Sequence, residues 1–450
     1  MEKQDRFYRF ILPLAELWLK RNFNYTYDTC KNIDGPVLVI VNHASAYDPI
    51  FTGVAFKDRA LTFIASEHIV RMKTWGPFLE KRFRLIPHRK GAKGSRTALI
   101  AMKRIRKGES VFLAAEGEQT WDGAPMPVMP HTGKLVKASG ATLVTFLIEG
   151  AYLSHPRWAP NKRKGKVYAH PVGIYSPEQL STMDEAQIEQ AIADDLNFDI
   201  WKWQSENPDG PVRFICKKGG NADGIERAVF TCPRCKSFGT LTSSKADKNG
   251  KNDKGGKTDK DGKAVKGGKT DKDMVRCECG FSVRLTDTGL FDQPEPFATI
   301  CDWEEFDRQQ LASKLRIAIS TPAKAADNES GEMSENGAAA NADTTTELSA
   351  PDTTIFADDD VCLKSINDDH EDEVMGNGLL RLTARDGRLV LEAPGREFDL
   401  CGLMGMTMVL SGRIVMSDKS GYYEITSGTA NLRKYIIARD IARTINNENA

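Results

Sequence analysis

The sequence predicts an α/β fold, with a mainly parallel sheet flanked by helices, over about residues 31–215. Two observations predict this fold. Short apolar runs rich in β-branched residues alternate along the chain with amphipathic stretches of helical periodicity, which is typical of strands joined by crossover helices. In addition, polar residues gather where the apolar runs end, and the site of an open α/β sheet lies at that edge.

The expected elements of this domain follow one another in a regular order. We expect strands at residues 37–41, 61–65, 84–87, 110–114, 142–148 and 166–171. Helices are expected at residues 49–55, 96–106 and 134–139. A longer helix is expected to start at Ser176-Pro177-Glu178, a favourable helix entry, and to carry Ile188, Ile192 and Leu196 on one face.

Most of the chain outside this domain divides into segments of different composition. Residues 1–30 form an amphipathic helical region, and a helix is expected within residues 296–320. Residues 216–295 hold four closely spaced cysteines around an insert, residues 243–273, that consists almost entirely of Lys, Asp, Gly and Thr. We expect disorder in this insert and in a Ser/Ala/Asn/Glu-rich linker at residues 321–353, because neither can bury a core.

Residues 354–447 contain seven short runs of strand-like alternation, followed by a helical stretch at about residues 431–445. Asp386-Gly387 and Ser411-Gly412 mark hairpin turns. This pattern predicts a small β-barrel-like domain capped by a helix, and its layout is similar to that of pleckstrin-homology-like modules. We expect this module to pack on the α/β domain or to bind a partner, and binding of lipid head groups is the alternative.

Charge is distributed unevenly along a chain whose formal net charge is zero. Residues 1–170 contain 28 Lys and Arg but 14 Asp and Glu, so an equal excess of negative charge lies in the remainder. A basic first third predicts an anionic partner: a phosphorylated substrate, a nucleotide-bearing carrier or an anionic membrane surface. The alternative interpretation is a set of solvated helix faces. We expect no nucleic acid partner.

The start of the sequence shows neither a signal peptide nor an apolar run of the roughly 18–20 residues that a membrane-spanning helix needs. Residues 6–21 instead place apolar side chains at helical spacing between basic residues: Phe7, Phe10, Ile11, Leu14, Leu17 and Trp18. Such a helix either lies in a bilayer interface or covers the core of the next domain, and the pattern favours neither.

The run at residues 37–41 ends abruptly at Asn42-His43, and Asp48 follows five residues after the histidine. A carboxylate bonded to one imidazole nitrogen fixes the tautomer and raises the basicity of the other nitrogen. The sequence therefore predicts that His43 is a general base for a hydroxyl group and that Asp48 supports it.

Two further loops leave strands of the same domain. Arg89 opens a basic segment, residues 89–96, and its guanidinium is suited to bidentate bonds with a phosphate. Glu116-Gly117 directly follows the strand at residues 110–114, and a glycine there lets backbone N–H groups approach a phosphate or an oxyanion closely.

In this order and at these separations, the three loops resemble the motifs of the glycerolipid acyltransferase family (PlsC-like 1-acylglycerol-3-phosphate acyltransferases). The resemblance covers about residues 7–215. It implies a glycerolipid-acyltransferase-like fold and transfer of a fatty acyl group from acyl-CoA or acyl-carrier protein to a lysophospholipid hydroxyl. The reaction so implied is conversion of lysophosphatidate to phosphatidate, in phospholipid biosynthesis.

The resemblance also implies residue roles. His43 would deprotonate the acceptor hydroxyl, Asp48 would orient His43, and Asn42, Arg89, Glu116 and Gly117 would bind substrate. A cytoplasmic protein, attached peripherally to the inner face of a membrane, would fit these roles.

Two departures from the family pattern are visible. Where the fourth motif of the family has a Val-Pro-Val-like core, this sequence has Phe146-Leu147-Ile148, which loosens the resemblance to the best-known members. The other departure concerns the acceptor. The third motif of the family usually runs Pro-Glu-Gly-x-Arg-Ser/Thr, but Ala115 and Gln119 stand at the proline and arginine positions here. A neutral amide cannot supply the charge of the arginine. The sequence therefore leaves open an acyltransferase for another lysolipid or alcohol, and a non-catalytic scaffold protein that binds membranes or partners.

Four of the nine cysteines form two close pairs, Cys232-Pro-Arg-Cys235 and Cys277-Glu-Cys279. Two such turns can bring four thiolates into the tetrahedron that Zn²⁺ prefers. The spacing resembles a zinc ribbon, and four protein ligands imply a structural Zn²⁺. Iron and independent thiols are the alternatives.

Overall fold

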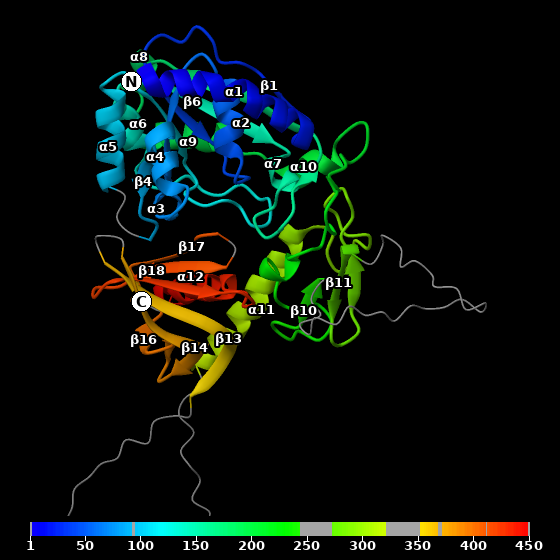
Figure 1. The fold of residues 1–450 in the computed structure, drawn as a ribbon. Helices are drawn as coiled ribbons and strands as arrows, with labels where there is room; N and C mark the ends of the chain where they lie inside the picture. The colour runs from blue at the N-terminus through cyan, green and yellow to red at the C-terminus, as the bar shows by residue number, and fades with distance from the viewer. Residues whose placement is uncertain are drawn as a thin grey trace, which may run out of the picture.

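A computed structural model describes residues 2–91, 95–243, 272–320, 352–367, 371–410 and 412–448, with the side chains of residues 2–5 excepted. The insert predicted at residues 243–273 and the linker predicted at residues 321–353 lie almost wholly outside the described residues. Figure 1 shows an α/β domain, a region around the cysteines and a C-terminal β-rich module.

The α/β domain is built on a seven-stranded sheet in the order β1-β8-β6-β2-β5-β3-β4. The strands are β1 (Tyr25–Tyr27), β2 (Val37–Val41), β3 (Leu61–Ser66), β4 (Ile86–His88), β5 (Ser110–Ala114), β6 (Thr142–Glu149) and β8 (Val167–Tyr175). Strands β6, β2, β5, β3 and β4 are parallel to one another, whereas β8 is antiparallel to β6. The mainly parallel sheet that we predicted is confirmed, with β1 and β8 running the opposite way.

Helices cover both faces of this sheet, and the residues of β2 alternate between them. Val37, Val39 and Val41 belong to a core shared with α1 (Glu2–Phe23) and α2 (Asp48–Ala55). Leu38 and Ile40 belong to a second core shared with α5 (Ser95–Ile105), α6 (Thr132–Ser139) and α9 (Glu185–Asp195). All five side chains are fully buried, which is why this strand is an uninterrupted apolar run.

The long helix predicted after Ser176 is two helices, α8 (Pro177–Thr182) and α9 (Glu185–Asp195). Each begins with its own capping box, formed by Ser176 with Gln179 and by Asp184 with Gln187. The Asp184 cap satisfies backbone N–H groups at the start of a new helix, so it competes with continuation of α8 through the same residues. Ile188 and Ile192 are buried as predicted.

Four short helices and two short strands complete the domain. They are α3 (Glu67–Val70), α4 (Gly76–Phe83), α7 (Ala151–Ser154), α10 (Ile200–Ser205) and the β7 (Arg163–Lys164)–β9 (Ile215–Cys216) pair.

Helix α1 covers the core of the α/β domain with one set of side chains and leaves another set of apolar side chains exposed. Tyr8, Leu12 and Leu19 are buried on the core of the α/β domain, whereas Phe10 and Leu17 remain 71% and 67% exposed. No helix among the described residues is long and apolar enough to cross a membrane.

The cysteine region contains a three-stranded antiparallel sheet, β10 (Leu241–Ser243), β11 (Met274–Cys277) and β12 (Ser282–Arg284), preceded by a short 3₁₀ helix, η1 (Ile225–Arg227). It packs on α11 (Ile300–Ser320). Asp307 of α11 accepts the backbone N–H groups of Phe230 and Thr231 at 2.9 and 2.8 Å, so this helix holds the segment that leads into the first cysteine pair.

The C-terminal module is a seven-stranded antiparallel sheet in the order β16-β15-β14-β13-β19-β18-β17, followed by α12 (Arg433–Glu448). Its strands are β13 (Thr353–Ile366), β14 (Asp372–Arg385), β15 (Arg388–Ala393), β16 (Arg396–Asp399), β17 (Gly405–Met408), β18 (Arg413–Ser417) and β19 (Tyr422–Ser427). The seven strands and the final helix match the prediction. The ladders leave β16 and β17 as edges and, among the described residues, do not close a barrel.

This module packs on the α/β domain near the ends of β3 and β4 (Figure 1). Ser417 donates to the Gly91 carbonyl at 2.7 Å, and Tyr422 donates to the Lys90 carbonyl at 2.9 Å. The basic segment that follows Arg89 therefore begins against the C-terminal sheet.

Candidate active site

His43 and Asp48 form the pair that the sequence predicted. The Nδ1 atom of His43 lies 2.9 Å from Oδ2 of Asp48, and the same oxygen accepts the Ser45 backbone N–H at 2.9 Å. Asp48 opens α2 with Pro49 directly after it, so the tight turn after β2 returns the carboxylate to the imidazole.

Asp48 is fully buried, while 23% of the His43 side chain is exposed. Burial raises the pKa of Asp48 above its ordinary value, and its hydrogen bonds with His43 and with Ser45 oppose that rise. The imidazole thus has one nitrogen fixed by a buried carboxylate and the other available to a ligand.

Asn42 lies beside this pair, and both the nitrogen and the oxygen of its side-chain amide form hydrogen bonds. Its Nδ2 donates to the Ile148 carbonyl at 3.2 Å, and its Oδ1 accepts the Ile148 backbone N–H at 2.9 Å. These two bonds continue the β2–β6 ladder with a side chain, and they set the direction in which the chain leaves β2.

The loop after β5 reaches the histidine from the other side. The Thr120 backbone N–H donates to the His43 carbonyl at 3.0 Å, and Gln119 donates from Nε2 to the Ala44 carbonyl at 3.2 Å. Gly117 has φ +73°, and a Cβ at that position would lie 2.4 Å from the Met129 sulfur. A glycine is therefore required at this turn.

A small pocket, with a cavity volume of about 20 Å³, lies at this edge of the sheet. Asn42, His43 and Glu116 line one side of it. Apolar side chains line much of the rest, among them Pro125, Ile148, Tyr152, Leu196, Phe198 and Ile200. The imidazole therefore faces a largely apolar recess that also contains one buried carboxyl group.

Arg89 is not brought to this pocket. Its guanidinium lies 3.3 Å from both oxygens of Glu67, 4.6 Å from the ring centroid of Tyr422, and 3.0 Å from the Asn367 carbonyl. The predicted phosphate-binding arginine is thus bonded to the C-terminal module in this structure.

The chain was compared with known proteins, and one match includes part of the pocket and the loops around it. Residues 21–149 match the family model described as Acyltransferase. The matched region contains His43, Asp48, Arg89 and the Glu116-Gly117 loop. No curated protein matches the chain.

Among solved structures, one that the chain resembles is the 1-acyl-sn-glycerophosphate (LPA) acyltransferase PlsC from Thermotoga maritima. The two chains are 15% identical, and the match covers 46% of this chain and 85% of that one, with a TM-score of 0.38.

Two residues near the His43–Asp48 pair were not proposed as site residues from the sequence. Arg157 is buried and donates to Glu118 at 3.2 Å and to the Gln119 carbonyl at 3.1 Å. Trp121 is buried beside it, with the Arg157 guanidinium 4.7 Å from its ring centroid. Arg157 lies beyond the matched residues 21–149, and nothing in its sequence indicates that it bonds to the loop after β5.

The four cysteines of the two close pairs converge. Their sulfur atoms all lie within 4.8 Å of one another, with 3.6 Å between Cys232 and Cys279 and 3.7 Å between Cys235 and Cys277. A tetrahedral Zn²⁺ with Zn–S bonds of about 2.3 Å would place its sulfurs about 3.8 Å apart. The positions of the four thiols therefore fit this ion.

Glu116 leads to a prediction about pH. Burial raises the pKa of its carboxyl to about 8, the nearby Asp48 carboxylate adds to the rise, and the His43 backbone N–H opposes it. Because this pKa lies above that of an unfolded glutamate, the folded protein binds the proton more tightly. The free energy of unfolding that this group contributes is therefore lost progressively as the pH rises from about 4.5 towards 8.

Glu116→Gln, which cannot ionise, is expected to remove this loss. Relative to wild type, the variant should gain stability between pH 5 and pH 8.5, by at most about 5 kcal/mol at 1.36 kcal/mol per pKa unit. Urea unfolding at several pH values measures the difference, and Glu185→Gln, at an exposed carboxylate, is the control. Parallel stability profiles for wild type and Glu116→Gln would contradict the shift.

Proposed function

We propose that the protein is an O-acyltransferase that moves a fatty acyl group from acyl-CoA or acyl-carrier protein to the hydroxyl of a lysophospholipid. The observation that carries the proposal is the His43–Asp48 pair at the mouth of the pocket, inside the region that matches the acyltransferase family. Our first choice of acceptor is lysophosphatidate, which would give phosphatidate.

The pair is suited to direct transfer. With Nδ1 of His43 held by Asp48, Nε2 removes the proton from the acceptor hydroxyl as its oxygen attacks the thioester carbonyl carbon. A carbon–oxygen bond forms, the carbon–sulfur bond breaks, and the thiolate leaves and takes the proton from His43. No covalent acyl-enzyme is needed.

The apolar part of the pocket supports an acyl substrate. Leu196, Phe198 and Ile200 line the recess, so an acyl group that widened it beside His43 would remove apolar surface from water at about 25 cal/mol per Å². A wholly polar alcohol would leave these side chains without a matching group.

The position of Arg89 favours a second candidate within the same reaction class. Its guanidinium is bonded to Glu67 and stacked on Tyr422, and Gln119 replaces the arginine expected in the third motif. Both observations reduce the positive charge available for an acceptor phosphate. An acyltransferase for another lysolipid or alcohol is therefore the alternative, and a non-catalytic binding protein is the alternative of another class.

One assay separates these candidates. Purified protein is incubated with a radiolabelled acyl-CoA or acyl-carrier protein and a panel containing lysophosphatidate, other lysophospholipids and simple alcohols. We expect transfer to lysophosphatidate above the others. Transfer to a different acceptor would replace lysophosphatidate as the proposed acceptor. No transfer to any acceptor would support the non-catalytic binding protein.

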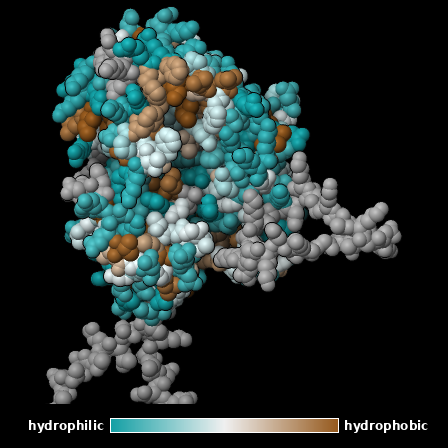
Figure 2. Space-filling model, in the orientation of Figure 1, coloured by the Kyte–Doolittle hydropathy of each residue, from teal (hydrophilic) through white to brown (hydrophobic). Residues whose placement is uncertain are grey.

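We also propose that the protein attaches peripherally to an anionic membrane, in the cytoplasm at the inner face. Exposed apolar side chains continue from α1 into the α3–α4 segment: Phe10, Leu14, Leu17, Trp18, Met72, Trp75 and Phe78. Phe7 of α1 packs on Phe78 with ring centroids 6.0 Å apart, so the two helices present one surface. Figure 2 shows brown side chains over the upper part of the molecule, where Figure 1 places α1.

Basic residues of α1 would give this apolar surface a preference for anionic lipids. Arg6, Arg9, Lys20 and Arg21 of α1 are exposed, which suits the head groups of anionic lipids. Phe10→Ser/Leu17→Ser is expected to reduce co-sedimentation with phosphatidylglycerol-containing vesicles at least about tenfold, because two interfacial side chains lose burial. Ile317→Ser, at another exposed apolar position, is the control. Equal binding by all three proteins would exclude this surface.

For the four cysteines we propose a structural Zn²⁺. Cys232, Cys235, Cys277 and Cys279 would supply all four ligands, which leaves no open position for substrate. The ion would hold the β10–β12 sheet to the segment that precedes it.

A further inference from the structure

The loop after β5 supports the backbone of the catalytic histidine. Thr120 donates to the His43 carbonyl and Gln119 donates to the Ala44 carbonyl, so displacement of the loop would displace the turn between His43 and Asp48. Thr120 is itself fixed, because its hydroxyl donates to Asp122 at 3.1 Å and accepts the Gly123 backbone N–H at 3.1 Å. What holds this loop therefore bears on the geometry of His43.

Trp121, in the same loop, is held between two arginines. The guanidinium of Arg157 lies 4.7 Å from its ring centroid and that of Arg433 lies 5.0 Å from it. Trp121 is 6% exposed, and the attraction between a cation and an aromatic face is stronger when both are removed from water. Its backbone carbonyl also accepts the Tyr152 hydroxyl at 2.9 Å.

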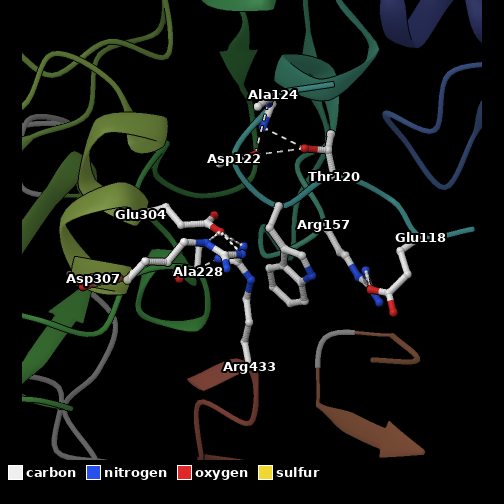
Figure 3. Close-up of polar contacts among 12 residues, drawn as sticks. Glu118, Thr120, Asp122, Ala124, Arg157, Ala228, Glu304, Asp307 and Arg433 are labelled. Atoms are coloured by element: carbon white, nitrogen blue, oxygen red, sulfur yellow. Dashed lines mark hydrogen bonds and ion pairs between the residues drawn. The ribbon is translucent and has the colours of Figure 1, made fainter. Parts of the chain in front are cut away.

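Arg433 comes from α12 of the C-terminal module and joins three other parts of the chain. It donates to the Ala228 carbonyl at 3.0 Å, pairs with the buried Glu304 of α11, and stacks on Trp121. Figure 3 shows Arg433 and Glu304 pointing toward one another beside the loop. One guanidinium thus connects the C-terminal module, the segment before the cysteines, α11 and the acyltransferase domain.

The positive charge of Arg433 is balanced by the carboxylate of Glu304. Burial opposes ionisation of Glu304, but the Arg433 and Arg308 guanidinia outweigh it and hold the pKa of this carboxyl below its ordinary value. Arg308 lies 3.0 Å from the same oxygen. Glu304 would therefore keep one partner if Arg433 were neutralised, which makes that substitution usable as a test.

A second tie runs through Arg157. While its Nη1 bonds Glu118 and the Gln119 carbonyl, its Nη2 donates to the Met408 carbonyl of β17 at 2.8 Å. The C-terminal module therefore reaches the loop after β5 from two elements, β17 and α12.

We propose that Arg433 and Trp121 are positioning residues, through which the C-terminal module holds the loop after β5 and the His43 backbone in the geometry required for transfer. The inference rests on the proposed function for its catalytic consequence. The positioning itself is a property of the loop and has its own readout. The acyltransferase domain is on this basis incomplete without α12, although neither residue touches the substrate.

The test compares Arg433→Gln with Arg443→Gln. Both arginines lie on α12, but the side-chain hydrogen bonds of Arg443 go to the Cys401 and Leu403 carbonyls of its own module rather than to the loop. We expect Arg433→Gln to lower kcat about 10- to 100-fold with little change in KM for the acyl donor, because small displacements of a catalytic group have effects of that size. Arg443→Gln should keep kcat within about twofold of wild type.

Arg433→Lys should recover part of the lost rate, because lysine keeps the charge opposite Glu304 but lacks the planar group that stacks on Trp121. Hydrogen exchange provides the readout that does not depend on activity. Peptides covering residues 116–125 should exchange faster in Arg433→Gln than in wild type or Arg443→Gln. If Arg433→Gln does not fold, Glu304→Gln/Arg433→Gln takes its place, since it removes both charges.

Unchanged exchange at residues 116–125 in Arg433→Gln would overturn the inference, and so would equal losses of kcat in the two single variants. Were the wild-type protein inactive on every acceptor, the proposed function would fail while the exchange measurement still decided the positioning.

Discussion

Replacing His43 by alanine is expected to lower kcat for acyl transfer by about 10²- to 10⁴-fold, the usual contribution of a positioned general base. The imidazole is the group at the pocket mouth with one nitrogen fixed by Asp48 and the other available to a hydroxyl. KM for the acyl donor should change little, because the apolar wall of the pocket is left in place. Steady-state kinetics with radiolabelled donor measures both constants.

His170→Ala is a matched control for this variant. Like His43, His170 is 23% exposed in its side chain and pairs with a carboxylate, Glu149 at 3.2 Å, but it does not line the pocket. Its loss should leave kcat near the wild-type value. Transfer that persists in His43→Ala would remove His43 from the role of base, and equal losses in both variants would point to destabilisation.

Asp48→Asn should follow His43→Ala in direction with a smaller or equal loss. An amide at this position would accept a hydrogen bond from the imidazole but could not stabilise the imidazolium formed during transfer.

Replacing Cys232 and Cys277 together by serine is expected to remove a bound Zn²⁺ and to destabilise the cysteine region by several kcal/mol. The double substitution removes one thiol from each close pair, so neither pair would keep both of its ligands. Zinc binding supplies folding free energy directly in small sites of this kind. Metal analysis of the purified wild-type protein should give about one Zn²⁺ per chain.

Cys362→Ser is the control for the metal, because Cys362 lies on β13 and outside the cluster. Zinc content should be retained in this variant and absent from Cys232→Ser/Cys277→Ser. A metal-free wild-type protein that is fully folded would refute the site, and iron in place of zinc would change the identity of the ion but not its ligands.

What the sequence predicted well depends on local chemistry. Strand β2 is apolar at every position because it is buried on both faces, and the spacing of His43 and Asp48 is the span of one turn between a strand and a helix. Both properties are encoded within thirteen residues. The closeness of the thiols within each cysteine pair was predictable for the same reason, because each turn brings its own two thiols together, whereas the meeting of the two pairs also depends on the β10–β11 ladder.

The contacts that the sequence did not predict involve residues that are far apart in the chain. Arg89 follows β4 as expected, but Tyr422 and Asn367 compete for its guanidinium, and no local pattern announces them. Nothing in the sequence around Arg157 or Trp121 indicates that they contact β17 and α12. The break between α8 and α9 is a different case: Asp184 was a visible capping residue, and the helical periodicity on either side obscured it.

The contact between Trp121 and Arg433 also fixes an order of events during protein synthesis. The ribosome adds roughly 5–20 residues per second, so about 15 to 60 seconds separate the appearance of the indole from that of its second arginine. For the later part of that interval all residues of the α/β domain have been added, but its loop after β5 lacks the tie to α12. If the tie positions His43, a nascent chain acquires full transfer activity only after α12 has emerged and docked.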